Sequence, residues 1–135
     1  GTIFAHNAKG VEIRILNKLK KKDSCLDLAN KIDKMIDRVE DSLTLSRMNF
    51  YSPKMNGEWK IKSIIKAIPD CPVSYDGQDN IGGGDEAQLA WFIYTDVNTN
   101  ENQRKEQIKN LLDYCAKDTL ALYYLIKFLM DKFNE

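Results

Sequence analysis

Apolar residues recur along the chain in short runs, and the first runs predict a strand followed by a helix. Residues 2–5 are apolar and partly β-branched, which predicts a strand that ends at the polar pair His6–Asn7. From Gly10 the apolar residues fall at helical spacing, and the run closes in a lysine cluster at Lys22. An amphipathic helix with a basic end is therefore expected after the strand.

The next segment predicts a longer helix with an uncertain last turn. Ser24 and Asp27 have the spacing of a capping box, and an apolar stripe of helical period continues to Leu43. Residues 39–45 also alternate in the manner of a short strand. Periodicity leaves both structures open for that turn.

The middle of the chain is the least regular part. Residues 49–57 contain proline, asparagine and glycine and predict a loop. Isoleucines at helical spacing over residues 61–68 predict a short helix, which Pro69 ends. Residues 69–84 are rich in proline and glycine, and Asp85 is expected to cap a further helix with an apolar core face that includes Trp91.

The C-terminal segment has the strongest helical pattern. Asn100 suits an N-cap, and one helix or two collinear helices are expected after it. Tyr114 and Asp118 lie four residues apart, about 40° from each other on the helix, at the edge of the apolar stripe. They are therefore placed to line a cleft. The stripe consists of Ile108, Leu111, Leu112, Cys115, Leu122, Ile126, Leu129 and Phe133.

Composition narrows the class of protein. The 135 residues fit one domain, and 43% hydrophobic with 30% charged residues indicates a soluble globular chain with no membrane span. Twenty basic and twenty acidic residues balance, so any surface that attracts nucleic acid must be local. Three separated cysteines and the absence of a signal-peptide pattern favour a reducing, cytoplasmic location.

Several motifs, in order, resemble those of one enzyme superfamily. Asn7 ends the expected strand, Glu12 follows on the next helix, and Tyr114-x-x-x-Asp118 lies on a later helix. This order is similar to the second and third motifs of the DEDD (DnaQ-like) 3′–5′ exonucleases. A second match, Tyr75-x-x-x-Asp79, lies among glycines and is assigned to a loop.

Further passages extend the resemblance from His6 to about Leu129. Asp41-Ser42-Leu43-Thr44-Leu45-Ser46-Arg47 resembles a passage of the superfamily. An uncharacterised bacterial branch, a domain of unknown function, is resembled by Gly57-Glu58-Trp59-Lys60-Ile61-Lys62, Ile64 to Pro69, Tyr75, the glycine run with Glu86-Ala87, and the run from Tyr114 to Ala121. The resemblance implies a ribonuclease H-like α/β fold, of which residues 1–135 would be a single, helix-rich C-terminal part with few short strands.

The resemblance also implies a chemistry. Cleaving a phosphodiester in this way uses two divalent ions, Mg²⁺ or Mn²⁺, held by carboxylates. Glu12 and Asp118 would be metal ligands, Tyr114 would orient the attacking water, and Asn7 would position the single-stranded 3′ end. The basic residues Lys18, Lys20 and Lys21 are candidate phosphate contacts, although a run of this kind is more often a solvated helix end.

The first motif of the superfamily, Asp-x-Glu on the opening strand, occurs nowhere in the chain. The expectation is therefore that the opening strands are missing, and that the missing part of the domain or a second chain would complete the site. The rival hypothesis is a non-catalytic helical module that binds a protein or a nucleic acid. His6, the only histidine, is expected to be a structural strand-end residue rather than a base.

Overall fold

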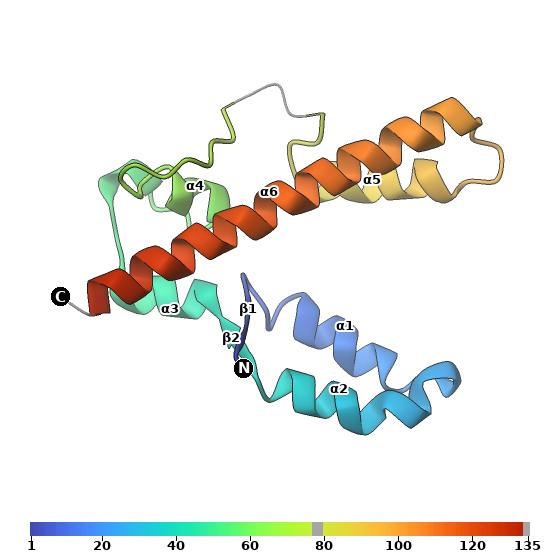
Figure 1. The fold of residues 1–135 in the computed structure, drawn as a ribbon, viewed down its shortest axis with the longest axis horizontal. Coiled ribbons are helices and arrows are strands. Elements are labelled where there is room, and N and C mark those ends of the chain that lie inside the picture. Colours follow the sequence, from blue (N-terminus) through green and yellow to red (C-terminus); the bar gives the residue numbers. More distant parts are fainter. Residues whose placement is uncertain (77–79, 134–135) are drawn as a thin grey trace.

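The computed structural model describes residues 1–76 and 80–133 (Figure 1). Within those ranges, no helix has both the length and the apolar character that a membrane span requires. Two elements, η1 and η2, are 3₁₀ helices. In chain order the elements are β1 (Ile3–Ala5), α1 (Glu12–Leu19), η1 (Asp23–Leu28), α2 (Ala29–Ile36), β2 (Val39–Asp41), α3 (Ser42–Asn49), η2 (Pro53–Met55), α4 (Ile61–Ile65), α5 (Gly84–Thr95) and α6 (Glu101–Phe133).

The two short strands form a parallel pair. Ile3 lies opposite Val39 and Ala5 lies opposite Asp41. Parallel strands need a crossover connection, and here α1, η1 and α2 supply it. The predicted strand at residues 2–5 is confirmed, and the helix-rich chain with its small parallel sheet is compatible with the expected α/β class.

The predicted long helix from Ser24 to Leu43 is divided among four elements, η1, α2, β2 and the start of α3. Ser24 lies inside η1, whose N-cap residue Lys22 makes no side-chain cap bond, so the expected capping box is wrong. After α2 the chain extends as β2, because residues 39–41 pair with β1, and α3 then begins at Ser42. Of the two structures that periodicity left open, the strand forms first and a new helix follows it.

The hydrophobic core lies between α4 and α6, with the turn before α4 closing one side. Ile64 and Ile65 of α4 are at most 1% exposed, and Leu125 of α6 is fully buried. The helix ends earlier than Pro69 predicts, although Ile68 still packs in the core. The remaining buried members are Met55, Ala67, Val73, Ala121 and Leu129.

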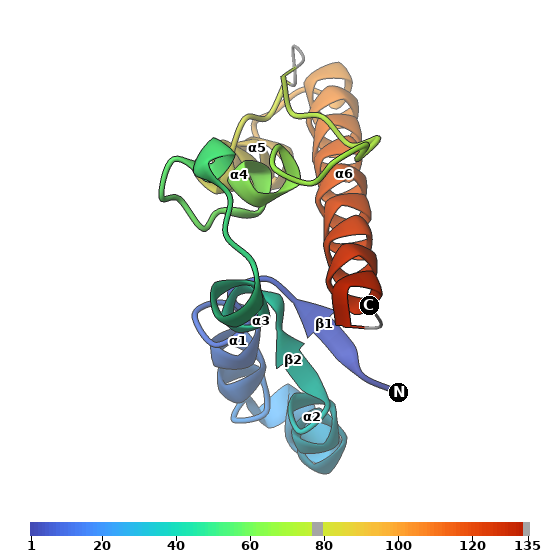
Figure 2. The same cartoon turned by 90° about the vertical axis from the view of Figure 1, so that its left-hand side faces the viewer.

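The C-terminal segment is one helix, and Asn100 caps it by accepting a hydrogen bond from the Gln103 N–H at 2.9 Å. The buried face of α6 differs from the predicted stripe. Leu112 is 62% exposed and Cys115 is also exposed. The helix packs on α5 along its N-terminal half and on α3 and α4 further along, so no single stripe is covered throughout (Figures 1 and 2). The Phe133 side chain and Asp79 lie outside the described residues.

Helix α5 begins two residues earlier than predicted. Gly83 is its N-cap and Asp85 lies in the first turn, where a carboxylate favours the helix dipole. Trp91 is 52% exposed, so its assignment to the core face is wrong, and the neighbouring Phe92 is 66% exposed. The helix is apolar on more than one face and α6 covers only one of them, which leaves these aromatic rings in solvent.

The core assignment predicts a contrast between two leucines of α6. Leu125→Ala removes a fully buried side chain and is expected to lower the free energy of unfolding by about 3 kcal/mol. Leu112→Ala, on an exposed position of the same helix, is expected to change it by less than about 0.5 kcal/mol. Urea unfolding followed by circular dichroism measures both, and similar losses would contradict the assigned core.

Candidate functional site

The Asp41 carboxylate joins the end of β2 to the turn that follows β1. As N-cap of α3 it accepts a hydrogen bond from the Leu43 N–H at 3.0 Å. It also accepts from the Asn7 N–H at 2.9 Å and from the Lys9 N–H at 3.4 Å. Asn7 has a left-handed backbone with φ of +62°, which asparagine tolerates better than most residues. One side chain therefore fixes both segments.

The charge state of Asp41 follows from these contacts. Burial acts to raise its pKa, but the four backbone N–H groups of Leu43, Lys9, Ala8 and Asn7 stabilise the charged form and hold the pKa below its ordinary value of 3.8. The carboxylate is therefore ionised at neutral pH, which strengthens each of the hydrogen bonds it accepts.

His6 adds a second link between the same strand end and two other segments. Its Nε2–H donates to the Trp59 carbonyl at 2.9 Å, and its Nδ1 accepts from the Ser42 hydroxyl at 2.9 Å. Burial lowers the pKa of His6, although the Trp59 carbonyl and nearby carboxylates oppose the shift. A neutral ring with both nitrogens engaged has no lone pair free to take a substrate proton, consistent with the expected structural role.

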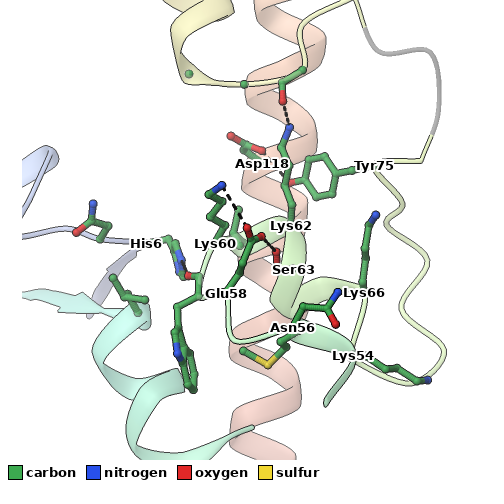
Figure 3. Close-up of a pocket in the computed structure, with 18 of the residues that line it drawn as sticks. His6, Lys54, Asn56, Glu58, Lys60, Lys62, Ser63, Lys66, Tyr75 and Asp118 are labelled. Carbon is green, nitrogen blue, oxygen red and sulfur yellow. Dashed lines mark hydrogen bonds and ion pairs between the residues drawn. The ribbon is translucent and has the colours of Figure 1, made fainter. Parts of the chain in front are cut away.

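These links place the strand end beside a cleft of about 1080 Å³, part of whose wall is formed by α6 (Figure 3). His6 and Asn7 line it from the end of β1, Tyr114 and Asp118 line it from α6, and Tyr75 comes from the segment between α4 and α5. Residues more than a hundred positions apart thus share one concave surface. Gly82, Gly83 and Gly84 form another part of the lining.

Two tyrosines converge on Asp118. The Tyr75 hydroxyl donates to Asp118 Oδ1 at 2.7 Å. Burial, together with the hydrogen bond and charge of Asp118, raises the pKa of Tyr114 to about 12. Tyr114 is therefore protonated at any physiological pH, so its hydroxyl is able to donate a hydrogen bond. The carboxylate is held by hydroxyls on two different segments.

Lys62 lies among the same aromatic rings. Its Nζ is 4.8 Å from the centre of the Tyr75 ring and 5.8 Å from that of Tyr114, and it donates to the Gly82 carbonyl. Figure 3 shows it directed toward Asp118 from α4. A cation between two ring faces fixes those rings by attraction to their negative faces.

Four further basic residues line the cleft, and two of them are paired. Lys60 lies 3.6 Å from Glu58, and Lys66 lies 2.5 Å from Asp76. Arg47 and Lys54 also line the cleft, and neither side chain makes an ion pair or hydrogen bond with the residues that the structure describes. With Lys62, five cations face three carboxylates among the described lining residues, so the cleft is locally basic in a chain of zero net charge.

The structure brings together only part of the predicted site. Asn7, Tyr114 and Asp118 line the cleft, and Asn7 folds back on Gly10, where a Cβ would come within 2.7 Å of its Oδ1. Glu12 is exposed in the first turn of α1 and is not among the lining residues. Its charge nevertheless acts to raise the pKa of His6, as those of Asp41 and Asp118 do.

The predicted basic contacts lie elsewhere. Lys18, Lys20 and Lys21 are at the far end of α1, and none of them lines the cleft. Lys20 is paired with Asp33 of α2 at 2.5 Å, which joins the two crossover helices. The helix carries this cluster away from the strand end because Lys18, Lys20 and Lys21 lie in its last turn and just beyond it. The cleft obtains its cations from residues 47–66 instead.

The carboxylates present do not form a metal site by themselves. No group of three or more His, Cys, Asp or Glu side chains in residues 1–76 and 80–133 is arranged to hold a metal ion. Asp118 already accepts a hydrogen bond from the Tyr75 hydroxyl, and Glu12 does not line the cleft. A metal centre at this position would take additional carboxylates from outside the described residues.

Sequence reasoning missed Tyr75 and the lysines beside α4. Tyr75 was assigned to a loop, which is correct, but that loop crosses α6 and delivers the hydroxyl to Asp118. The lysines carried a signal, since four occur between residues 54 and 66 among apolar positions. Comparison of the chain with family models, curated proteins and solved structures gives no match.

The buried position of His6 predicts its titration. Since the chain has one histidine, the imidazole proton signals of His6 are the only histidine ring signals in the NMR spectrum. The pH at the midpoint of their titration is expected to lie below 6.5. Because the folded pKa is the lower one, the contribution of His6 to stability is complete above pH 6.5 and declines as the pH falls below it. A midpoint above 6.5 would contradict the buried, neutral ring.

Removing the Asp41 carboxylate is expected to weaken the whole junction. Asp41→Ala should lower the free energy of unfolding at neutral pH by about 2 kcal/mol, since it removes a helix cap and leaves the Asn7 N–H without its acceptor. Because the folded pKa of Asp41 is lowered, this difference should shrink as the pH falls below 3.8. Denaturant unfolding of both proteins against pH measures it, with the exposed Asp113→Ala as control.

Proposed function

We propose that this chain is part of a metal-dependent 3′–5′ exonuclease with a ribonuclease H-like fold, and that its cleft receives the 3′ end of a single-stranded nucleic acid. The observation that carries the proposal is the shared cleft: Asn7, Tyr114 and Asp118, which the sequence resemblance selected, line one basic concavity. The cations that surround it suit a ligand made of phosphates.

The order of elements supports the fold part of this proposal. Two parallel strands joined by helices, followed by a long helix that bears the Tyr-x-x-x-Asp pair, agree with the arrangement that the resemblance implies. The cleft also lies at the carboxyl end of β1, where His6 and Asn7 follow the strand. In open α/β sheets ligands bind at the carboxyl ends of the strands.

Within the chain, two groups have assigned tasks. Tyr114 is protonated because its pKa is about 12, and the hydrogen bond that its hydroxyl makes with Asp118 would be exchanged for one to a water or to a phosphate oxygen when the ligand binds. Asp118 supplies negative charge at the base of the cleft, held in place by Tyr75. The divalent ions of such an enzyme would require additional carboxylates, from another part of the polypeptide or from a second chain.

A second function is favoured by a specific observation. The described residues contain no three-ligand cluster, and tyrosine hydroxyls already occupy Asp118. A module that binds nucleic acid or protein through the same cleft, without cleaving it, needs no metal. The two proposals differ in whether Asp118 is required for turnover.

Metal-dependent trimming of a nucleic acid separates them. We expect a polypeptide that contains this chain and the missing carboxylates to shorten a 5′-labelled single strand stepwise in Mn²⁺, and this chain alone to be inactive. Asp118→Asn should abolish trimming, and Tyr114→Phe should slow it by about a hundredfold. Asp113→Asn, on an exposed part of the same helix, should leave the rate unchanged.

Denaturing gel electrophoresis of DNA and RNA strands follows the products. Normal trimming by Asp118→Asn would overturn the nuclease proposal. Absence of trimming by every form, with the strand still bound, would favour the binding module.

A further inference from the structure

An aromatic pair lies beside the basic side of the cleft. The rings of Tyr51 and Trp59 are 6.4 Å apart, centre to centre, and tilted by 43°. Trp59 lines the cleft and packs against the core, whereas Tyr51 is 62% exposed. Neither residue is fully buried, since Tyr51 is mostly exposed and Trp59 is partly buried.

The backbone at Trp59 is fixed from both sides. Its carbonyl accepts the hydrogen bond from His6, and the chain then enters α4 at Ile61. The turn before it is set by left-handed conformations at Asn56 and Gly57, with φ of +50° and +74°. A ring on a fixed backbone loses little entropy when a flat ligand stacks on it.

Three cations near this pair in sequence are unpaired or only weakly paired within the described residues. Arg47 lies on α3 and Lys54 lies on η2, and both line the cleft with Trp59. Lys60, the residue after Trp59, is held only by a 3.6 Å contact with Glu58 on a surface where both side chains are more than half exposed. Such an exposed pair is weak and is readily exchanged for a phosphate.

These features match the two requirements of a single-strand binder, which are cations that follow the backbone and aromatic faces that stack on bases. A duplex would meet the first requirement but not the second, since its bases are paired and stacked on one another. A lone phosphate or a polyphosphate would have no use for the aromatic pair. The combination therefore selects single-stranded nucleic acid among polyanions.

We propose that Arg47, Lys54 and Lys60, with the Tyr51–Trp59 pair, form a binding track on which a single-stranded nucleic acid stacks one base and lays its phosphates. The track leads to Tyr114 and Asp118 on the other side of the cleft. This inference deepens the proposed function and rests on it for the direction of the strand. Binding along the track needs neither metal nor Asp118.

Binding of a labelled single strand of about 12 nucleotides, in EDTA, tests the track. Fluorescence anisotropy of fluorescein-labelled oligothymidylate gives the Kd over a range of NaCl concentrations. Lys54→Gln and Arg47→Gln should each reduce the slope of log Kd against log salt by about 0.7. Lys31→Gln, on the exposed face of α2, should leave the slope unchanged.

The aromatic part has its own variant and control. Tyr51→Ala should raise the Kd by about tenfold, since a base–aromatic stack is lost. Tyr123→Ala removes a tyrosine of similar exposure, 58%, from a part of α6 that does not line the cleft, and should leave the Kd unchanged. Circular dichroism of each variant confirms that it is folded.

Trp59 itself reports stacking. In a Trp91→Phe protein it is the only tryptophan, and its fluorescence should be quenched by oligothymidylate but not by an abasic strand of the same length. The track would be overturned if the protein bound an abasic strand or a blunt duplex as tightly as oligothymidylate. It would also be overturned if Tyr51→Ala bound oligothymidylate as tightly as wild type does. If the binding results overturn the track but Mn²⁺-dependent trimming is still observed, the proposed function stands. If Asp118→Asn loses trimming but binds the single strand as wild type does, the track stands.

Discussion

The position of the cleft depends on one buried carboxylate. Asp41 ends β2, caps α3 and holds the backbone N–H groups of the turn after β1. Since β1 and β2 pair over only three residues each, the strand ladder alone would hold this junction weakly. The negative charge of Asp41 adds bonds that a neutral side chain would make less strongly, and they set where His6 and Asn7 point.

From this junction, His6 extends the constraint to the other side of the cleft. Its ring connects the start of α3, through Ser42, to the carbonyl of Trp59 just before α4. The Ile64–Ile65 face of α4 then packs on α6, which carries Tyr114 and Asp118. A short series of contacts therefore joins the three parts of the cleft wall, which are the strand end with α3, the segment that leads into α4, and α6. Each contact restricts the position of the next part.

The cleft combines charges of both signs for a physical reason. Asp118 sits among tyrosine hydroxyls, and the cations from residues 47–66 surround it at the rim. A phosphate-bearing ligand would be attracted by the rim and oriented by the hydroxyl donors, while Asp118 prevents the interior from binding an anion directly. A site of this type would place a ligand next to Asp118 while that carboxylate keeps its negative charge. This arrangement is compatible with both a nuclease and a binding module.

The sequence by itself determined the local elements whose signals are local. The apolar, partly β-branched residues 2–5 predicted the first strand, isoleucine spacing predicted α4, and Asn100 predicted the cap of α6, whose continuity was left open by the sequence. It also placed Tyr114 and Asp118 on one edge of that helix. The division of residues 24–49 into η1, α2, β2 and α3 needed pairing with β1, which periodicity within the segment cannot reveal.

Only the tertiary structure decided which side chains share the cleft. Tyr75 reaches Asp118, and the cations of residues 47–66 line the same cleft, because a loop and a short helix fold against α6. The distance along the chain gives no sign of this. Lys18, Lys20 and Lys21 have the positive charge that a phosphate contact requires, but they lie at the C-terminal end of α1, outside the cleft. Charge and periodicity are properties of a segment, whereas a site is set by the packing of segments on one another.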